Sequence, residues 1–208
     1  MPMTFPAHQG LILPVVRMWP NSFDALALSV GAAMPDITDT VLGFSINGYF
    51  KQWYGHSLLG IFTLDFLGGL FITWVLAVIA RRLLEARSLR ERWKMFLRKE
   101  PADGYSADNS TRTPLRLWSF SMLVGILSHI GFDLISHRTN LLFYPWYENV
   151  HWFPSWWYRT WFEGQPVLIF GHPYLVGVYS LSWGALTLIG IFLFFQFLTQ
   201  TDAETGRQ

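Results

Sequence analysis

Long apolar runs separated by polar stretches dominate the hydrophobicity pattern of this chain. The segment from Ser57 to Ala80 carries a single acid, Asp65, and the segment from Tyr174 to Leu198 carries no charge. A bilayer hydrocarbon core about 30 Å thick is crossed by about 20 apolar residues in a helix. Both segments are therefore predicted to be transmembrane helices.

Two further apolar segments contain polar residues. Leu117 to Ser136 begins as an apolar run and then carries His129 and Asp133. Phe23 to Phe44 contains Pro35 and is interrupted by the acids Asp24, Asp36 and Asp39. We expect the first to span the membrane and the second to be a kinked span or a re-entrant half-helix that turns back at the proline. Irregular backbone at that depth needs cover from protein or a water-filled cavity.

The connections between these segments differ in composition. The link at about 81–116 carries ten lysines and arginines, and its first half is predicted to be a basic amphipathic helix. Basic loops stay in the cytoplasm, so this link is expected to mark the inner side. A lipid- or partner-binding role for it is the less favoured reading. The connection at about 137–172 is rich in tryptophan and tyrosine, which favour the headgroup region. We therefore expect it to lie along the outer membrane interface or, alternatively, to pack as a lid over the helix ends.

Composition supports a membrane protein. Of 208 residues, 51% are hydrophobic and 14% are charged, whereas soluble domains have about 25% charged residues. The net charge of +1 gives no reason to expect a nucleic-acid partner. Cysteine is absent, which excludes disulfides and thiolate chemistry. The sequence thus predicts an all-α, polytopic helical bundle with three to four transmembrane helices, in which residues 1–208 form one membrane domain. Membrane lipids are the expected partners, and the sequence does not define an oligomeric state. The opening residues lack the pattern of a cleaved signal peptide and are expected in the mature protein.

The strongest candidate chemistry is the row His129, Asp133 and His137. Spacings of four place the three side chains on one face of a helix. The row rises by roughly 12 Å, so one metal ion cannot bind all three, but His129 can share an ion with Asp133, or Asp133 with His137. The alternative is a polar stripe with the aspartate paired to a histidine. Ionisable groups within a span are costly and usually functional, which favours a metal or proton-handling role.

Other candidates lie outside this row. His56, at the start of its helix, is expected level with the Asp133 end of the cluster. Asp36 follows Pro35. Two interpretations fit it equally well: a kink at the proline aims its carboxylate into a cavity, or it caps a helix end. Asp39 needs solvent, a partner or an ion. Asp65 is predicted to support the cluster or handle protons. Histidine and carboxylate ligands without thiolates suit a divalent ion such as zinc, with manganese or iron as alternatives.

Four short motifs occur in an order that resembles a known family. They are MPMTFPAHQGLILP at the start, MPDI around Asp36, GHSLLG around His56 and SHIGFDLISH from 128 to 137. The chain resembles the DUF4184 family of bacterial membrane proteins, and is similar in motif order to the predicted membrane-bound metal-dependent hydrolases of the YdjM type. It departs from the family pattern in two places. Pro6 and Ala7 precede the first histidine, which the family usually places directly after a serine. Asp65 stands where the pattern leads us to expect an apolar residue or proline.

The resemblance implies a function and a ligand set. The implied metal ligands are His8, Asp36, His56, His129 and Asp133. Catalytic roles for His137, as a base beside the ligands, and for Asp65, as a proton-handling group, are hypotheses from the residues themselves. The implied protein is a metal-dependent hydrolase of the bacterial inner membrane, acting on a lipid-linked or membrane-associated ester or phosphoester. The alternative is a small transporter or proton-coupled protein that uses the buried aspartates.

The implied ligand set raises a topological question about His8. If residues 23–44 crossed the membrane fully, His8 would start on the side opposite His56. One site then requires a re-entrant or short first helix, or an N-terminal segment that dips into the bundle. The re-entrant form is the favoured prediction, because Pro35 lies where the chain would turn.

Overall fold

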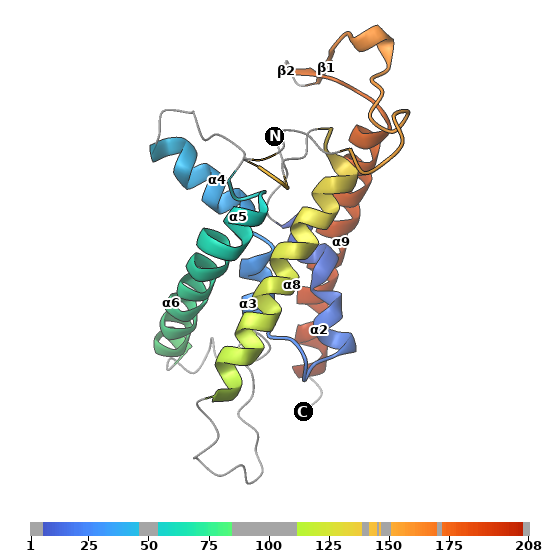
Figure 1. Ribbon diagram of the computed structural model, residues 1–208. Coiled ribbons are helices and arrows are strands. Elements are labelled where there is room, and N and C mark those ends of the chain that lie inside the picture. Colours follow the sequence, from blue (N-terminus) through green and yellow to red (C-terminus); the bar gives the residue numbers. More distant parts are fainter. Residues whose placement is uncertain are drawn as a thin grey trace.

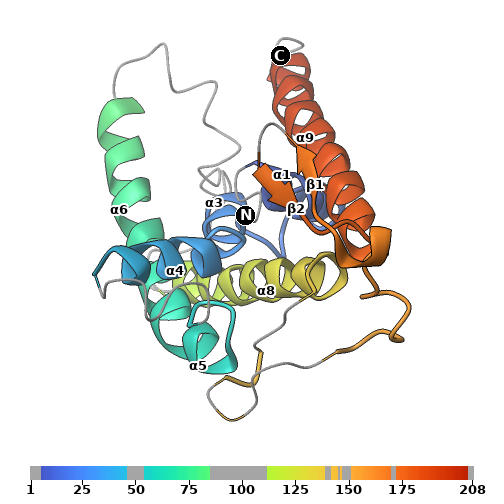
Figure 2. The same cartoon turned by 90° about the horizontal axis from the view of Figure 1, so that it is seen from above.

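The computed structural model describes residues 6–45, 54–84, 112–138, 142–144, 146, 151–169 and 172–205. It is a helical bundle, as predicted (Figures 1 and 2). Three helical stretches are long and apolar enough to cross a membrane, at Leu58–Ala80, Leu115–Ser136 and Val178–Thr199. A fourth is present if the bent pair α3 (Ala25–Gly31) and α4 (Met34–Ser45) counts as one span. The protein is therefore a multi-helix membrane protein by fold.

The first N-terminal helix lies inside this bundle, and the second follows it at the surface. Helix α1 (Ala7–Ile12) and helix α2 (Pro14–Met18) follow one another and pack beside α9 (Val178–Thr205), and α1 also contacts α8 (Arg112–Ser136). A Cβ atom on Gly190 would lie 2.2 Å from the carbonyl oxygen of Ala7, so the two backbones touch. Small residues permit such close helix packing in membranes. Figure 1 shows α2 near the end of the bundle where the C-terminus lies, so α1 approaches from the opposite end.

Helices α3 and α4 form a bent unit at the centre of the molecule. They differ in direction by 44° at a break between Gly31 and Met34. Pro35 stands in the first turn of α4, where a missing backbone N–H costs little. In Figure 1, α4 leads on from α3 at an angle, and the bent pair fits both forms of the prediction, a kinked span and a re-entrant segment. His8 reaches the cluster because the N-terminal segment dips into the bundle.

The first long span contains a local irregularity. Helix α5 (Leu58–Gly60), capped by the Ser57 hydroxyl, leads into a π-helical turn η1 (Ile61–Asp65), and α6 (Phe66–Leu84) follows. Such π turns inside helices occur often at functional sites. Asp65, at the end of the turn, is fully buried. The main hydrophobic core joins α3, α4, η1 and α8 through Ala27, Val30, Met34, Ile61, Met122, Ile126 and Ile130.

The connection between α8 and α9 carries the only strands among the described residues. Strands β1 (Val167–Ile169) and β2 (His172–Tyr174) form an antiparallel hairpin next to the short helix η2 (Phe162–Gly164). Trp157 Nε1 donates to the carbonyl oxygen of Ile135 and holds this connection to the end of α8. The hairpin was not predicted from the sequence, and its short strands leave the fold essentially all-α.

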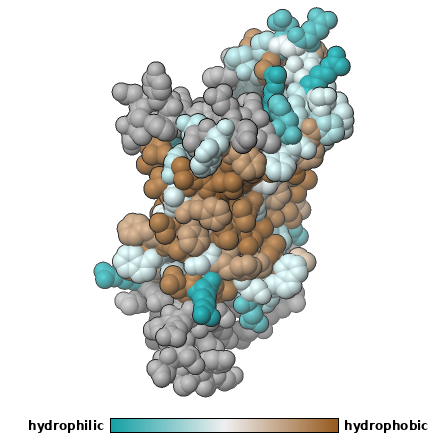
Figure 3. All heavy atoms as spheres, in the orientation of Figure 1, coloured by the Kyte–Doolittle hydropathy of each residue, from teal (hydrophilic) through white to brown (hydrophobic). Residues whose placement is uncertain are grey.

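The surface of the bundle is apolar across its middle. Figure 3 shows a hydrophobic belt with polar residues toward both ends of the visible face. Exposed side chains of α6 and α9 include Leu67, Phe71, Leu188 and Phe192, which is the surface expected to face lipid tails. Most of the basic link lies outside the described residues, so its predicted helix is not described.

Candidate metal centre

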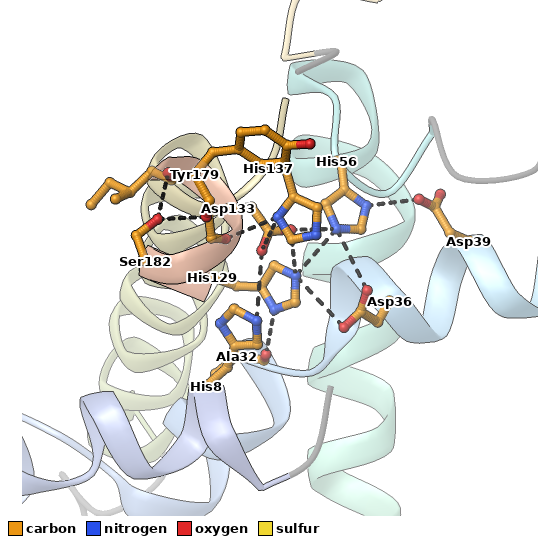
Figure 4. A network of polar contacts seen from close by, with 12 residues as sticks. His8, Ala32, Asp36, Asp39, His56, His129, Asp133, His137, Tyr179 and Ser182 are labelled. Carbon is orange, nitrogen blue, oxygen red and sulfur yellow. Dashed lines mark hydrogen bonds and ion pairs between the residues drawn. The ribbon is translucent and has the colours of Figure 1, made fainter. Parts of the chain in front are cut away.

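Histidines and aspartates from distant parts of the chain meet near one end of the bundle (Figure 4). Helix α1 supplies one histidine, α4 two aspartates, the residue before Ser57 another histidine, and α8 and its end the rest. This end is opposite the one where α6 ends and α8 begins (Figure 1). The members are His8, Asp36, Asp39, His56, His129, Asp133 and His137. All of them were singled out in the sequence.

The orientation of His129 is fixed by the break between α3 and α4. Its Nδ1 lies 2.8 Å from the carbonyl oxygen of Ala32, and the ring is completely buried. Because a carbonyl only accepts, Nδ1 must carry the proton and Nε2 holds a lone pair in the neutral ring. Close packing of α3 on α8 makes this contact, since a Cβ on Gly125 would lie 2.3 Å from the carbonyl oxygen of Leu28.

His56 is oriented in the same way by a carboxylate. Asp39 Oδ2 lies 2.7 Å from His56 Nδ1, while Asp39 Oδ1 accepts a hydrogen bond from the Gly55 backbone N–H at 2.7 Å. Nδ1 therefore donates, and in the neutral ring Nε2 points into the cluster with a lone pair, as it does in His129. Burial disfavours a charged ring, but the hydrogen bonds to Asp133 and Asp39 outweigh it and raise the pKa of His56 well above its usual value. The surroundings of this ring thus favour positive charge.

Four potential ligands converge on one point. His56 Nε2 is 3.2 Å from His129 Nε2 and 3.0 Å from Asp133 Oδ2, and the last two atoms are 3.3 Å apart. The Asp36 carboxylate completes the group, 3.5 Å from His56 Nε2 and 3.7 Å from His129 Nε2. Zinc–ligand distances of roughly 2.0–2.1 Å place neighbouring atoms of a tetrahedron about 3.4 Å apart. The spacings among His56, His129 and Asp133, 3.0 to 3.3 Å, are close to that value, and Asp36 approaches the two histidines with different oxygens, Oδ1 at 3.5 Å and Oδ2 at 3.7 Å.

His8 joins the cluster from the other side. Its ring stacks on His129 with centroids 4.0 Å apart, and its Nε2 lies 3.6 Å from Asp133 Oδ1. Burial, together with the nearby His129, lowers the pKa of His8 to about 3, so the ring is neutral and able to bind a metal at neutral pH. Two groups of potential ligands lie within 4.8 Å, His8 with His129 and Asp133, and Asp36 with His56 and His129. The five predicted ligands thus form two overlapping groups that share His129.

The two residues predicted to be catalytic occupy different positions. His137 lies at the half-exposed end of α8, with Nδ1 3.3 Å from Asp133 Oδ1 and 2.9 Å from the Ser136 hydroxyl. Asp65 lies apart from the ligand atoms, beside the Thr38 side chain and within electrostatic range of His56. Both of its oxygens are buried without a hydrogen bond of good geometry. His137 borders the cluster directly, and Asp65 does not.

Sequence reasoning left two contributors without a role. The sequence marks Asp39 only as an acid in need of a partner, and the Ala32 carbonyl belongs to the backbone, which carries no signal of its own. The spacing of three between Asp36 and Asp39 puts both on one side of a helix, which is a usable signal. Nothing in the sequence indicates that the Ala32 carbonyl would face a histidine 97 residues away.

Together, the fold and this cluster define a class: a small polytopic membrane protein with a buried histidine–aspartate centre at one end of its bundle. The family model described as "Domain of unknown function (DUF4184)" matches residues 1–160. The chain therefore belongs to the DUF4184 family. Comparisons with curated proteins and with solved structures find no match. The matched region contains every member of the cluster, whereas α9, which supports α1, lies outside it.

Proposed function

We propose that this protein is a membrane-embedded, metal-dependent hydrolase acting on a lipid-linked or membrane-associated ester or phosphoester. One observation carries the proposal: two histidine Nε2 atoms face each other at 3.2 Å, although both Nδ1 atoms are committed as donors. In neutral rings two lone pairs would meet there, next to two carboxylates. Buried lone pairs and carboxylates converge in this way around a cation.

The residues divide into ligands and supports. His56, His129, Asp36 and Asp133 would hold a divalent ion, zinc first and manganese or iron as alternatives. Bound there, the ion would lower the pKa of a water molecule and polarise the scissile group. Asp39 and the Ala32 carbonyl fix the tautomers of the two histidines, as the outer partners of metal-binding histidines commonly do. With one ion present, His137 is the group placed to accept a proton on the half-exposed side.

The surroundings of the cluster support a lipid-linked substrate. The apolar belt of the bundle brings the end of the molecule that holds the cluster to the level of lipid headgroups (Figure 3). This arrangement favours an ester carried on a lipid.

The proposed location is the bacterial inner membrane. The basic link between α6 and α8 would lie in the cytoplasm, because short loops rich in arginine and lysine are retained there. The cluster lies near the other end of both helices. The proposed reaction would then take place at the outer face of the membrane.

Metal analysis of the purified full chain tests the proposal. We expect stoichiometric divalent metal in the wild-type protein and its loss in His129→Ala, because His129 belongs to both ligand groups. His151→Ala is the matched control, since His151 packs on Tyr158 outside the cluster. The same preparations would be assayed against carboxylic and phosphoric esters in mixed micelles. Wild-type protein without bound metal, or metal unchanged in His129→Ala, would refute the proposal.

A second candidate function is supported by Asp65. A fully buried carboxylate without a good hydrogen bond, located in a π turn of a span, is typical of proton-coupled membrane proteins. A transporter that uses this group predicts that Asp65→Asn abolishes transport while metal content stays unchanged. Proton uptake into proteoliposomes would measure it. Absence of proton movement in wild-type vesicles would exclude this candidate.

A further inference from the structure

Asp133 presents its two oxygens to two different sets of nitrogens. Oδ2 faces His56 at 3.0 Å and His129 at 3.3 Å. Oδ1 faces His137 at 3.3 Å and His8 at 3.6 Å. Figure 4 shows the carboxylate between these rings. The first set forms the ion position proposed above, and the second set has no assigned task.

The second set lacks the bonding expected of buried polar groups. Asp133 Oδ1 has no hydrogen bond of good geometry, although two ring nitrogens approach it, and His8 Nδ1 has no partner. Both residues are more than nine-tenths buried, with exposed fractions of 8% and 7%. Roughly 90% or more of buried polar groups have a partner. Asp133 Oδ1 therefore lies buried between two ring nitrogens without a good hydrogen bond to either, a position that suits a carboxylate ligand of a cation.

One ion cannot use both sets. His129 Nδ1 is bonded to the Ala32 carbonyl, so this ring has only Nε2 to offer and binds a single ion. His129 and His137 are eight residues apart, a helical rise of roughly 12 Å, and contact Asp133 through different oxygens. An ion bound by His137 must therefore lie around a different point from an ion bound by His129, and His8 Nε2 approaches the Asp133 oxygen that faces His137.

From this geometry we infer a second divalent-cation position formed by His8 Nε2, His137 Nδ1 and Asp133 Oδ1, so that the Asp133 carboxylate bridges two ions. The inference rests on the proposed function, which supplies the first ion. Three protein ligands leave coordination positions open for water or substrate, as in catalytic zinc sites. His137 then acts as a ligand in place of its role as a proton acceptor.

A second ion narrows the substrate class. Paired ions about 3.5–4 Å apart hold both the attacking and the leaving oxygens in phosphoester cleavage. Two-metal sites also cleave acyl bonds, but a phosphoester uses both ions most fully, because one ion can hold the attacking oxygen and the other the in-line leaving oxygen. The bridged centre therefore points to a phosphoester attached to a lipid, with the phosphate on the His137 side of Asp133, where the cluster is most exposed.

The test counts zinc in the full chain. Purified protein in detergent would be stripped with a chelator, reloaded with zinc, dialysed and measured by mass spectrometry. We expect two equivalents in the wild type and one in both His8→Ala and His137→Ala. His151→Ala, in a ring outside the cluster, keeps two. Gel filtration confirms folding, and the partial exposure of His137 makes its variant the safer of the two if His8→Ala aggregates.

A second readout tests the bridge itself. In the cobalt(II)-loaded wild type, two ions joined by one carboxylate are magnetically coupled, and the coupling disappears in His137→Ala. One zinc equivalent in the wild type, or two retained in His137→Ala, overturns the second position. If His137→Ala loses hydrolysis but no zinc, His137 is a proton acceptor and not a ligand. No zinc in the wild type overturns the proposed function as well, so the two failures are distinguishable.

Discussion

Replacing Asp39 by asparagine changes one atom and tests whether His56 is a metal ligand. Asp39 accepts the Nδ1 proton of His56 through Oδ2 and the Gly55 N–H through Oδ1, both at 2.7 Å. An asparagine that keeps the Gly55 bond must turn its NH₂ group toward Nδ1. That group donates, so the neutral ring has to move its proton to Nε2. The nitrogen facing the ion then has no lone pair.

The size of the effect follows from this change of tautomer. Loss of the outer partner of a metal-binding histidine costs about 10–100-fold in metal affinity, or about 1.4–2.8 kcal/mol at 1.4 kcal/mol per factor of ten. We expect a value near the upper limit, because asparagine does not merely remove the acceptor but donates in its place. The overall fold should persist, since the helix that carries Asp39 keeps its length and its contacts with η1 and α8.

Zinc affinity would be measured by competition with a chromophoric chelator in the detergent-solubilised protein. Asp24→Asn is the matched control: Asp24 is also buried, but it caps α3 by accepting from the Ala27 N–H. Asparagine caps helices about as well as aspartate, and Asp24 lies outside the cluster, so zinc affinity should not change. Equal zinc affinities for Asp39→Asn and the wild type would refute the assignment of His56 as a ligand held by Asp39.

Three further predictions follow from packing and burial. Gly190→Leu should separate α1 from α9, because its Cβ would lie 2.2 Å from the Ala7 carbonyl oxygen. Such overpacking lowers the free energy of unfolding by about 1–3 kcal/mol. An unchanged thermal midpoint in detergent would contradict the contact. Asp65→Leu should raise stability by about 1–3 kcal/mol, since it removes a buried, poorly bonded carboxylate; a lower midpoint would indicate an unseen partner. Asp24→Ala should lower the free energy of unfolding by about 1 kcal/mol, because it removes the cap of α3, which Asp24→Asn keeps.

The spans could be predicted because lipid imposes a length and a composition that a sequence displays directly. The expected spans from Ser57 and from Tyr174 correspond to observed helices at Leu58–Ala80 and Val178–Thr199. Helices α1 and α2 could not be recognised in the same way. They span only Ala7–Ile12 and Pro14–Met18, too short for a transmembrane pattern, and they are placed by contact with a helix about 180 residues later in the chain.

The α8 part of the cluster was accessible from spacing alone. A period of four on a helix places His129, Asp133 and His137 on one face. In the structure, a ring nitrogen of each histidine lies 3.3 Å from an oxygen of the Asp133 carboxylate between them. Spacing could not show that the two oxygens of Asp133 face different nitrogens. That distinction depends on side-chain rotation and on where α1 and α4 arrive, which are tertiary features.

The irregular parts of the backbone lie where the cluster forms, and this explains why sequence periodicity ended there. The break between α3 and α4 frees the Ala32 carbonyl from the helix, and that carbonyl fixes His129. The π turn ends at Asp65, behind the cluster. A regular α-helix through either place would have kept its carbonyl groups within its own hydrogen bonds. The Ala32 carbonyl is therefore committed to a side chain of another helix, and a continuous helical span could not have supplied it.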